Sequence, residues 1–128
     1  ENQFGPGAAG ANIHASGTPL KGEPVFTKHF PNSFRETPLQ KHLDGLGALR
    51  LVIAGMMTHM CVDTTVRAAF DLGFPCLLAH DACATRALSF GGVVLEADQV
   101  QRAYMAALDR TFAAVRAADD ICGEIAGK

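Results

Sequence analysis

The sequence predicts an α/β fold in which a mostly parallel sheet carries helices on both faces. Two short apolar runs, Leu49–Ala54 and Cys76–Ala79, are nearly continuous, which is typical of strands buried on both faces. Apolar residues at helical spacing follow each run, from Cys61 to Leu72 and again after Asp98. This alternation of strands and helices is typical of a doubly wound, Rossmann-like sheet, here within a single domain over residues 1–128.

The first part of the chain predicts a loop, a short strand and a helix. Residues 1–23 contain five glycines and two prolines without apolar periodicity, which indicates loops. Val25–Thr27 is β-branched or aromatic and predicts a strand that ends at Lys28. Thr37 is the predicted N-cap of a helix that Gly47 ends, because Thr-Pro-Leu-Gln fits a capping box with proline at the first helical position.

The two later helices have start and stop signals of their own. Thr58 is the candidate N-cap of the helix that begins at Cys61, and Gly73 ends that helix. Asp98 is the predicted N-cap of the last long helix, which helical spacing alone extends to about Ala118. The apolar residues that stack on one of its faces are Tyr104, Leu108 and Phe112.

Composition narrows the functional classes. The 128 residues are 48% hydrophobic and 19% charged, which provides for a core and excludes general disorder. A net charge of −2 without Lys/Arg clusters argues against a nucleic-acid partner. No apolar run approaches the roughly 20 residues of a membrane span. The four cysteines lack C-x-x-C spacing and are therefore interpreted as free thiols in a reducing compartment. We therefore expect a soluble cytoplasmic protein, with Cys76 in the core and Cys83 on a loop near the strand ends.

Ligands of open α/β sheets bind at the carboxyl ends of the strands, so the residues there are candidates for chemistry. Three segments qualify: Lys28, Gly55–Cys61 and His80–Asp81. Cys61 opens a helix, where the helix dipole and unpaired N–H groups favour a thiolate and can hold an oxyanion. By position alone, Cys61 can equally be a packed thiol. Lys28 follows a strand among phenylalanines, so its ammonium is either held in a site or lies at the surface.

The histidines offer a second arrangement of the same kind. Cys61 with His59 or His80 and with Asp81 would make a Cys-His-Asp hydrolase. As metal ligands the histidines are poorly spaced, because no H-x-x-x-H, H-x-H or His/Cys cluster occurs. Both glycine-rich phosphate-binding motifs are also missing, so we expect neither a metal nor a cofactor.

The segment Gly55–Ala69 (Gly-Met-Met-Thr-His-Met-Cys-Val-Asp-Thr-Thr-Val-Arg-Ala-Ala) resembles the isochorismatase-like cysteine hydrolases, which include nicotinamidases and N-carbamoylsarcosine amidohydrolase. The shared pattern is a strand, then G-x-x-T-x-x-C-V, then a helix with T-x-x-A-A. Two further segments match in the expected order: residues 22–39, with Lys28, and residues 79–85, with Asp81. The resemblance extends over residues 8–121.

The resemblance implies an isochorismatase-like hydrolase fold and a Cys-Lys-Asp triad. Cys61 would be the nucleophile, Lys28 the cation that supports its thiolate, and the N–H groups of Met57 and Cys61 the oxyanion hole. A non-proline cis peptide would join Met56 to Met57, and the protein would be a homo-oligomer, either a dimer or a tetramer. Our candidates for the apolar wall of the substrate pocket are Phe30, Phe34, Met57 and Met60.

Two features of the family are not found in this sequence. The third triad member, an aspartate that ends the family's first strand, is expected upstream of Glu1, within about 50 residues that would add one or two βα units. The metal ligands of the nicotinamidase subgroup would also lie mostly upstream, so metal-dependent nicotinamidase activity is not favoured.

The family also implies a different end for the chain than helical spacing does. Its pattern ends the long helix near Phe112, makes residues 113–117 an edge strand and starts a short helix after Asp119. We adopt this version, because Asp119-Asp120 is a good helix start and the alanines around it do not discriminate.

These residues predict a hydrolase that cleaves a small amide-type (C–N) substrate through a Cys61 thioester. The vinyl ether of isochorismate offers no acyl carbon for a thiol to attack. Two alternatives remain: an isochorismatase-type vinyl-ether hydrolase, and a catalytically inactive binding module on the same fold. Neither a nucleic acid nor a membrane is an expected partner.

Overall fold

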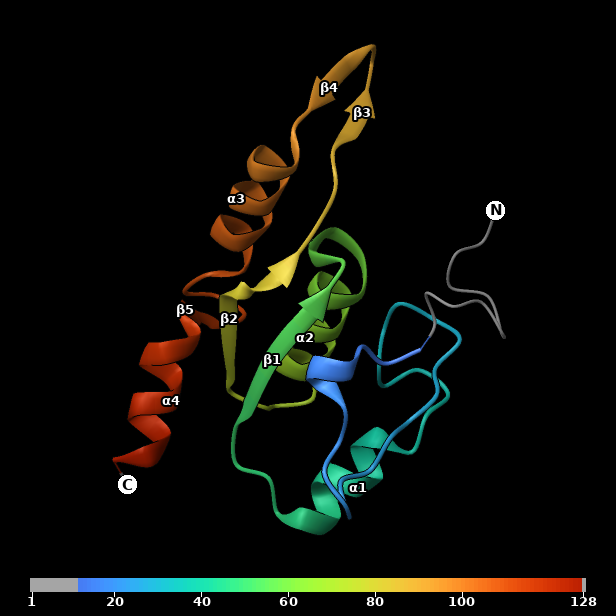
Figure 1. Cartoon of the computed structure of the whole chain (residues 1–128), viewed down its shortest axis with the longest axis vertical. Coiled ribbons are helices and arrows are strands. Elements are labelled where there is room, and N and C mark those ends of the chain that lie inside the picture. Colours follow the sequence, from blue (N-terminus) through green and yellow to red (C-terminus); the bar gives the residue numbers. More distant parts are fainter. Residues whose placement is uncertain (1–11, 128) are drawn as a thin grey trace.

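The computed structural model describes residues 12–127 and has the predicted α/β architecture (Figure 1). The helical elements are the 3₁₀ turn η2 (Ala15–Gly17), α1 (Leu39–Leu46), the π-helical turn η3 (Thr58–Val62), α2 (Asp63–Asp71), α3 (Ala97–Leu108) and α4 (Ala118–Ala126). The strands are β1 (Leu51–Met56), β2 (Cys76–Ala84), β3 (Leu88–Phe90), β4 (Val93–Leu95) and β5 (Ala114–Arg116). Strands β1, β2 and β5 form one sheet, and β3 pairs with β4 in a separate hairpin.

The sheet is parallel, with β2 between β1 and β5. Leu51 of β1 is paired with Cys76, and Leu77 is paired with Ala114 of β5. The first four residues of β2 are all buried, as its continuous apolar run predicts. Strand β2 continues to Ala84, five residues beyond the predicted end, so Cys83 lies in a strand and not on a loop.

Alternate residues of β2 face two different helical layers. Cys76 and Leu78 belong to a core cluster with α2 and α3, which supply the buried side chains of Val66 and Leu108. On the other face, Leu77 and Ala79 pack against Ile121 of α4. Helices therefore cover both faces of β2, and the fold is doubly wound.

Strand β1 is less covered than its apolar run predicts. Its burial alternates, and the Val52 side chain is 50% exposed. Val52 is paired with Leu77, so the two residues share a face of the sheet, and α4 packs on β2 at that face. Within residues 12–127 the expectation that β1 is buried on both faces is therefore wrong.

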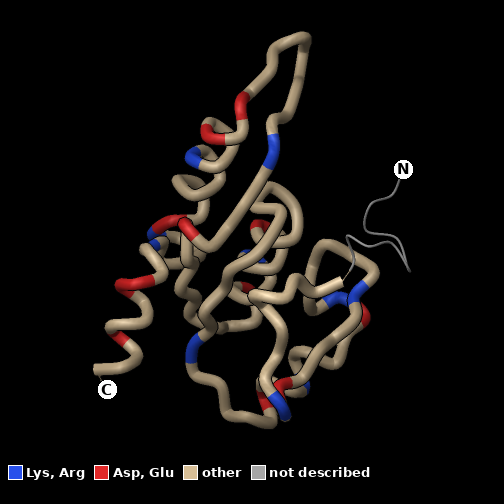
Figure 2. The backbone as a smooth tube through the Cα atoms, in the orientation of Figure 1, with Lys and Arg blue, Asp and Glu red and all other residues tan. Residues whose placement is uncertain are grey.

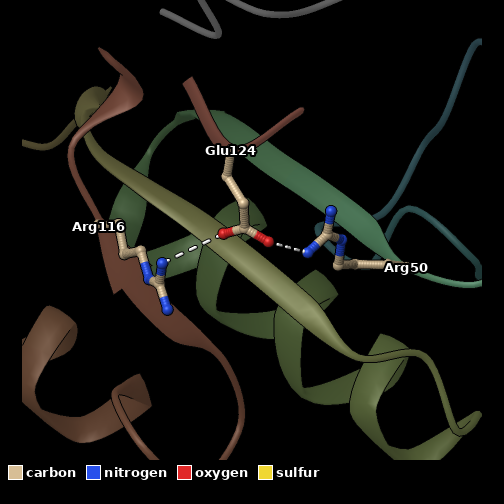
Figure 3. Close-up of polar contacts among 3 residues, drawn as sticks. All are labelled: Arg50, Arg116 and Glu124. Carbon is tan, nitrogen blue, oxygen red and sulfur yellow. Dashed lines mark hydrogen bonds and ion pairs between the residues drawn. The ribbon is translucent and has the colours of Figure 1, made fainter. Parts of the chain in front are cut away.

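A polar clamp attaches α4 to the two outer strands of the sheet (Figure 3). The Glu124 carboxylate accepts hydrogen bonds from Arg50, next to β1, and from Nη1 of Arg116 in β5, the latter at 3.2 Å. The carboxylate and Arg50 are each about one third exposed, so water screens the clamp only in part. The clamp complements the apolar contact of Ile121 on the same helix.

For the first part of the chain, the predicted strand is wrong and the predicted helix cap is confirmed in part. Residues 23–28 pair with no strand of the described chain, so the predicted strand at Val25–Thr27 is absent. Helix α1 begins at Leu39 with Pro38 at the N-cap position. One residue earlier, Thr37 Oγ1 accepts the Leu39 N–H at 3.4 Å, which is the hydrogen bond of the predicted cap. The same hydroxyl also donates to the carbonyl of Ser33 at 2.5 Å, which binds the helix start to the preceding loop. The helix ends at Gly47 as predicted.

The starts and ends of the later helices also differ from those that the apolar spacing predicts. The helical path begins at Thr58, before Cys61, as the π-helical turn η3. Helix α3 has Glu96 as its N-cap, because a Glu96–Gln99 capping box forms, and Asp98 lies within the first turn. The helix ends at Leu108, so the helix extended to Ala118 is wrong; the order of edge strand and short helix implied by the family is correct.

The β3–β4 hairpin was not predicted, although the sequence signals it. Gly91 and Gly92 have φ angles of 59° and 79°, and a Gly-Gly pair between apolar residues is typical of a two-residue hairpin turn. The hairpin projects from the body of the molecule (Figure 1) and carries no charged residue (Figure 2). Its Phe90 side chain is 89% exposed.

The helices were also considered as possible membrane spans. Among residues 12–127, the structure contains no helix that is both long and apolar enough to cross a membrane.

We expect Ile121→Ala to lower the free energy of unfolding by about 2–4 kcal/mol, because it deletes a buried side chain between α4 and β2. Ile125→Ala is the matched control on the same helix; its side chain is half exposed, so the loss should be clearly smaller. Urea unfolding of the full-length protein measures both values. Equal losses would show that Ile121 does not hold α4 to the sheet.

Candidate active site

Cys61 and Lys28 meet at the carboxyl end of β1. The Lys28 ammonium Nζ lies 3.3 Å from Cys61 Sγ. The same Nζ donates to the carbonyl of Phe30 at 3.0 Å and to that of Pro31 at 3.3 Å. Three acceptors therefore hold the ammonium in one direction, although the lysine as a whole is exposed.

The loop that carries Lys28 is anchored on α2. The Ser33 N–H donates to Thr65 Oγ1 at 3.1 Å, and the two hydroxyl oxygens are also 3.1 Å apart. Phe34 follows, and its ring stacks on Phe74 with 6.4 Å between centroids. A polar contact and an aromatic contact thus hold the loop in place. Both partners lie 32 or more positions away along the chain.

The turn that carries Cys61 has an unusual backbone. The peptide between Met56 and Met57 is cis, as the resemblance implies. The turn follows Gly55, where the pairing of β1 with β2 shifts and φ is 133°, a conformation that favours glycine. The carbonyl of Met57 then accepts the N–H groups of Met60 and Val62, at 3.0 and 3.3 Å.

Thr58 holds this turn from inside and is not its N-cap, so that prediction is wrong. The residue is fully buried. Its hydroxyl lies 2.7 Å from Oε1 of Gln101 in α3 and 3.2 Å from the carbonyl of Ala84. The sequence analysis did not single out Gln101, whose partners lie 43 and 21 positions away in the chain.

A pocket of about 160 Å³ opens beside the thiol. Its size suits a small group, because complete drug-sized ligand sites are larger. The residues that line it come from β1, from η3 and α2, and from the Lys28 loop: Lys28, Ser33, Ile53, Ala54, Gly55, Met56, Cys61, Val62 and Thr65.

The four candidates for the pocket wall are not among these lining residues. Phe34 packs against the core cluster, which explains its position. The Phe30 ring is covered by the Arg35 guanidinium, 3.6 Å from its centroid. Met60 is 39% exposed, and Met57 precedes the turn at its N-cap. A contact of any of them with substrate stays a prediction.

The Cys-His-Asp arrangement is not assembled. Nδ1 of His59 lies 2.6 Å from the Thr85 hydroxyl, and its ring meets Tyr104 edge-on. Burial, together with the charge of Arg86, lowers the pKa of His59. Asp81 accepts the Ala118 N–H at 2.8 Å and so caps the start of α4. His59 and Asp81 are thus engaged with other groups, His80 is exposed, and within residues 12–127 no hydrogen bond joins any of the three side chains to Cys61.

The remaining thiols differ from Cys61 in their surroundings. Burial raises the pKa of Cys76, which lies in the core. It also raises the pKa of Cys83, as the nearby Asp81 charge does to a smaller extent. These two thiols are therefore protonated at neutral pH, and Cys122 is exposed on α4. Among residues 12–127, no three His, Cys, Asp or Glu side chains are grouped as metal ligands.

Comparison with known proteins places this chain in a family. The Isochorismatase domain model matches residues 1–120. YddQ, an isochorismatase family protein of Bacillus subtilis, is 44% identical over 113 residues, which are 88% of this chain and 63% of YddQ. A crystal structure from Oleispira antarctica, assigned to the isochorismatase hydrolases, has a TM-score of 0.87 and 51% identity and covers 91% of this chain and 62% of that one.

A shorter match involves an amidohydrolase. Ureidoacrylate amidohydrolase RutB of Klebsiella pneumoniae is 35% identical over 65 residues, which are 51% of this chain and 28% of RutB. The chain spans less than two thirds of the length of each of these three relatives.

We expect Lys28→Ala to slow the alkylation of Cys61 by iodoacetamide at neutral pH about threefold to tenfold, because it removes the ammonium beside the sulfur. Lys21→Ala, at an exposed loop position, is the control and should leave the rate unchanged. Mass spectrometry of the labelled full-length protein measures the rate at Cys61. An unchanged rate in Lys28→Ala would remove Lys28 from the site.

Proposed function

We propose that this chain, which belongs to the isochorismatase family, is a cysteine hydrolase that acts on a small amide-type (C–N) substrate. One observation carries the proposal: a lysine ammonium, oriented by two carbonyl groups, lies 3.3 Å from a thiol that faces a small pocket. A cation at this distance stabilises the thiolate, which is the nucleophilic form of cysteine.

In the proposed reaction the Cys61 thiolate attacks the carbonyl carbon of the substrate and forms a C–S bond. The negative charge moves to the carbonyl oxygen, which accepts hydrogen bonds from the N–H groups of Met57 and Cys61 in the turn. Collapse of this intermediate breaks the C–N bond, and the amine leaves with a proton. Water then hydrolyses the thioester, which releases the acid and restores the thiolate.

The proton for the leaving amine requires a carrier. Two carboxylates on the elements around the site are engaged elsewhere: Asp63 pairs with Arg67 at 3.0 Å, and Asp81 caps α4. We therefore assign the carrier to neither of them. Lys28 contributes as a fixed cation, because its ammonium is held by three acceptors.

Amide-type chemistry is preferred over the two alternatives for a chemical reason. A vinyl ether gives a thiolate no acyl carbon, so the Cys61–Lys28 contact would have no use in its hydrolysis. A binding module has no need of an ammonium beside its thiol. The amidohydrolase RutB among the relatives supports the same choice.

We expect Cys61→Ala to lower kcat on an amide substrate more than about a thousandfold, because the thioester can no longer form. Cys122→Ala, which removes an exposed thiol, is the matched control and should keep the native kcat. Substrates come from a screen of small amides, carbamoyl compounds and isochorismate with the full-length protein. Full turnover of an amide by Cys61→Ala would exclude covalent catalysis.

Trapping the intermediate gives an independent measurement. Rapid acid quench of the full-length protein during turnover should show Cys61 with the added mass of the acyl group. Turnover of isochorismate alone in the same screen would favour the vinyl-ether reaction, and no turnover with slow Cys61 labelling would favour the binding module.

Self-association is a further part of the proposal. The β3–β4 hairpin supports it, because both outer edges of its strands lack charged residues, and identical antiparallel strands can pair across a two-fold axis. We expect the full-length protein to be a dimer or tetramer by light scattering, and Val94→Lys, at a half-exposed position of β4, to shift it toward smaller species. A monomer at working concentration would end this part of the proposal.

A further inference from the structure

We propose that Gln101 is a positioning residue for the proposed reaction: its side-chain amide holds the turn that presents Cys61 and the two oxyanion N–H groups. The inference rests on the proposed function and extends it to α3, an element outside the sequence motif of the family. Gln101 is half-buried, and its amide lies between η3 and β2.

The hydrogen-bond partners fix the orientation of the amide. The backbone carbonyl of His80 can only accept, so Nε2 of Gln101, 3.0 Å away, donates to it. The amide oxygen Oε1 then faces Thr58, whose hydroxyl donates to it at 2.7 Å. Gln101 thus links the carboxyl-terminal half of β2 to the first residue of the turn.

Thr58 transmits this link to the site. It is fully buried, its carbonyl accepts the N–H of Asp63, and it lies between Met57 and Cys61. The hydroxyl has one proton, and its shorter contact is with Gln101; the carbonyl of Ala84 is 3.2 Å away. Loss of the amide leaves this buried hydroxyl with the longer contact alone, and the turn is free to shift.

A shift of the turn and the Lys28 contact are separable. The loop of Lys28 is anchored on α2 through Ser33 and Thr65, and not on α3. Removal of Gln101 should therefore displace the Met57 N–H, which adjoins Thr58, while Cys61, at the α2 end of the turn, keeps its contact with the ammonium. Alkylation of a thiolate uses no oxyanion hole, whereas amide hydrolysis does.

The experiment compares hydrolysis with alkylation in the full-length protein. We expect Gln101→Met to lower kcat about tenfold, with KM nearly unchanged, because a misplaced oxyanion donor affects the transition state more than substrate binding. The rate of Cys61 labelling by iodoacetamide should stay native. Gln99→Met is the matched control: it removes a glutamine of the same helix, whose amide accepts the Glu96 N–H, and should keep the native kcat.

A double-mutant cycle tests the route through Thr58. If Gln101 acts through the hydroxyl, Thr58→Val lowers kcat to a similar extent, and the combination with Gln101→Met causes little further loss. Should Gln101→Met not fold, Gln101→Glu replaces it. That variant keeps an acceptor for Thr58, loses the donor to His80 when ionised, and should lower kcat severalfold with native labelling.

Three results would overturn the proposal. They are a native kcat in folded Gln101→Met or Gln101→Glu, an equal fall of kcat and labelling rate, and effects of Thr58→Val and Gln101→Met that multiply. Failure of the underlying function is distinguishable, because then either Cys61→Ala retains full turnover or the native protein hydrolyses no amide.

Discussion

The burial of β2 on both faces is the constraint on which the rest of the structure depends. Leu78 on one face and Leu77 on the other need apolar cover, so helices must pack on both sides of this strand. Helices α2 and α3 cover one side and α4 the other. Because β1 runs parallel to β2, the carboxyl ends of both strands emerge at the same edge of the sheet. The turn with Cys61 begins there, and the backbone of β2 beyond its buried part supplies carbonyl groups that hold it, directly from Ala84 and through Gln101 from His80.

Two separately anchored segments meet at this edge. The loop of Lys28 is held on α2, and η3 is held by β2 and α3. The hydroxyl groups of Thr65 and Thr58, both buried residues, take part in this anchoring. An unpaired polar group in a buried position would cost free energy. In the described part of the chain, no buried side-chain nitrogen or oxygen lacks a hydrogen-bond partner. The ammonium and the thiol therefore meet through two independent sets of contacts, one for each segment.

The sequence predicts the strands and helices of the fold and the residues of the site to different degrees. The apolar run of β2 and the helix after Cys61 follow from local patterns, which two-sided burial and helical spacing produce. Local patterns fail where distant residues decide. Thr58 has the residue type of an N-cap, but its hydroxyl is hydrogen-bonded to Gln101 and Ala84, which lie far along the chain. The cis peptide and the edge strand β5 were predictable from the family alone, since neither alanine spacing nor a Met-Met pair signals them.

Cys61 and Cys83 lie near the same edge of the sheet but have different surroundings. Both thiols lie near the carboxyl ends of neighbouring strands, and both are partly buried. Around Cys83, burial and the Asp81 charge favour the neutral thiol, and its pKa is raised. Beside Cys61 stands an ammonium that cannot turn toward solvent without losing two carbonyl contacts. The difference comes from the loop of residues 28–34, which contributes no strand or helix to the fold and reaches Cys61 alone of the two thiols. In the proposed function, this loop therefore decides which thiol reacts.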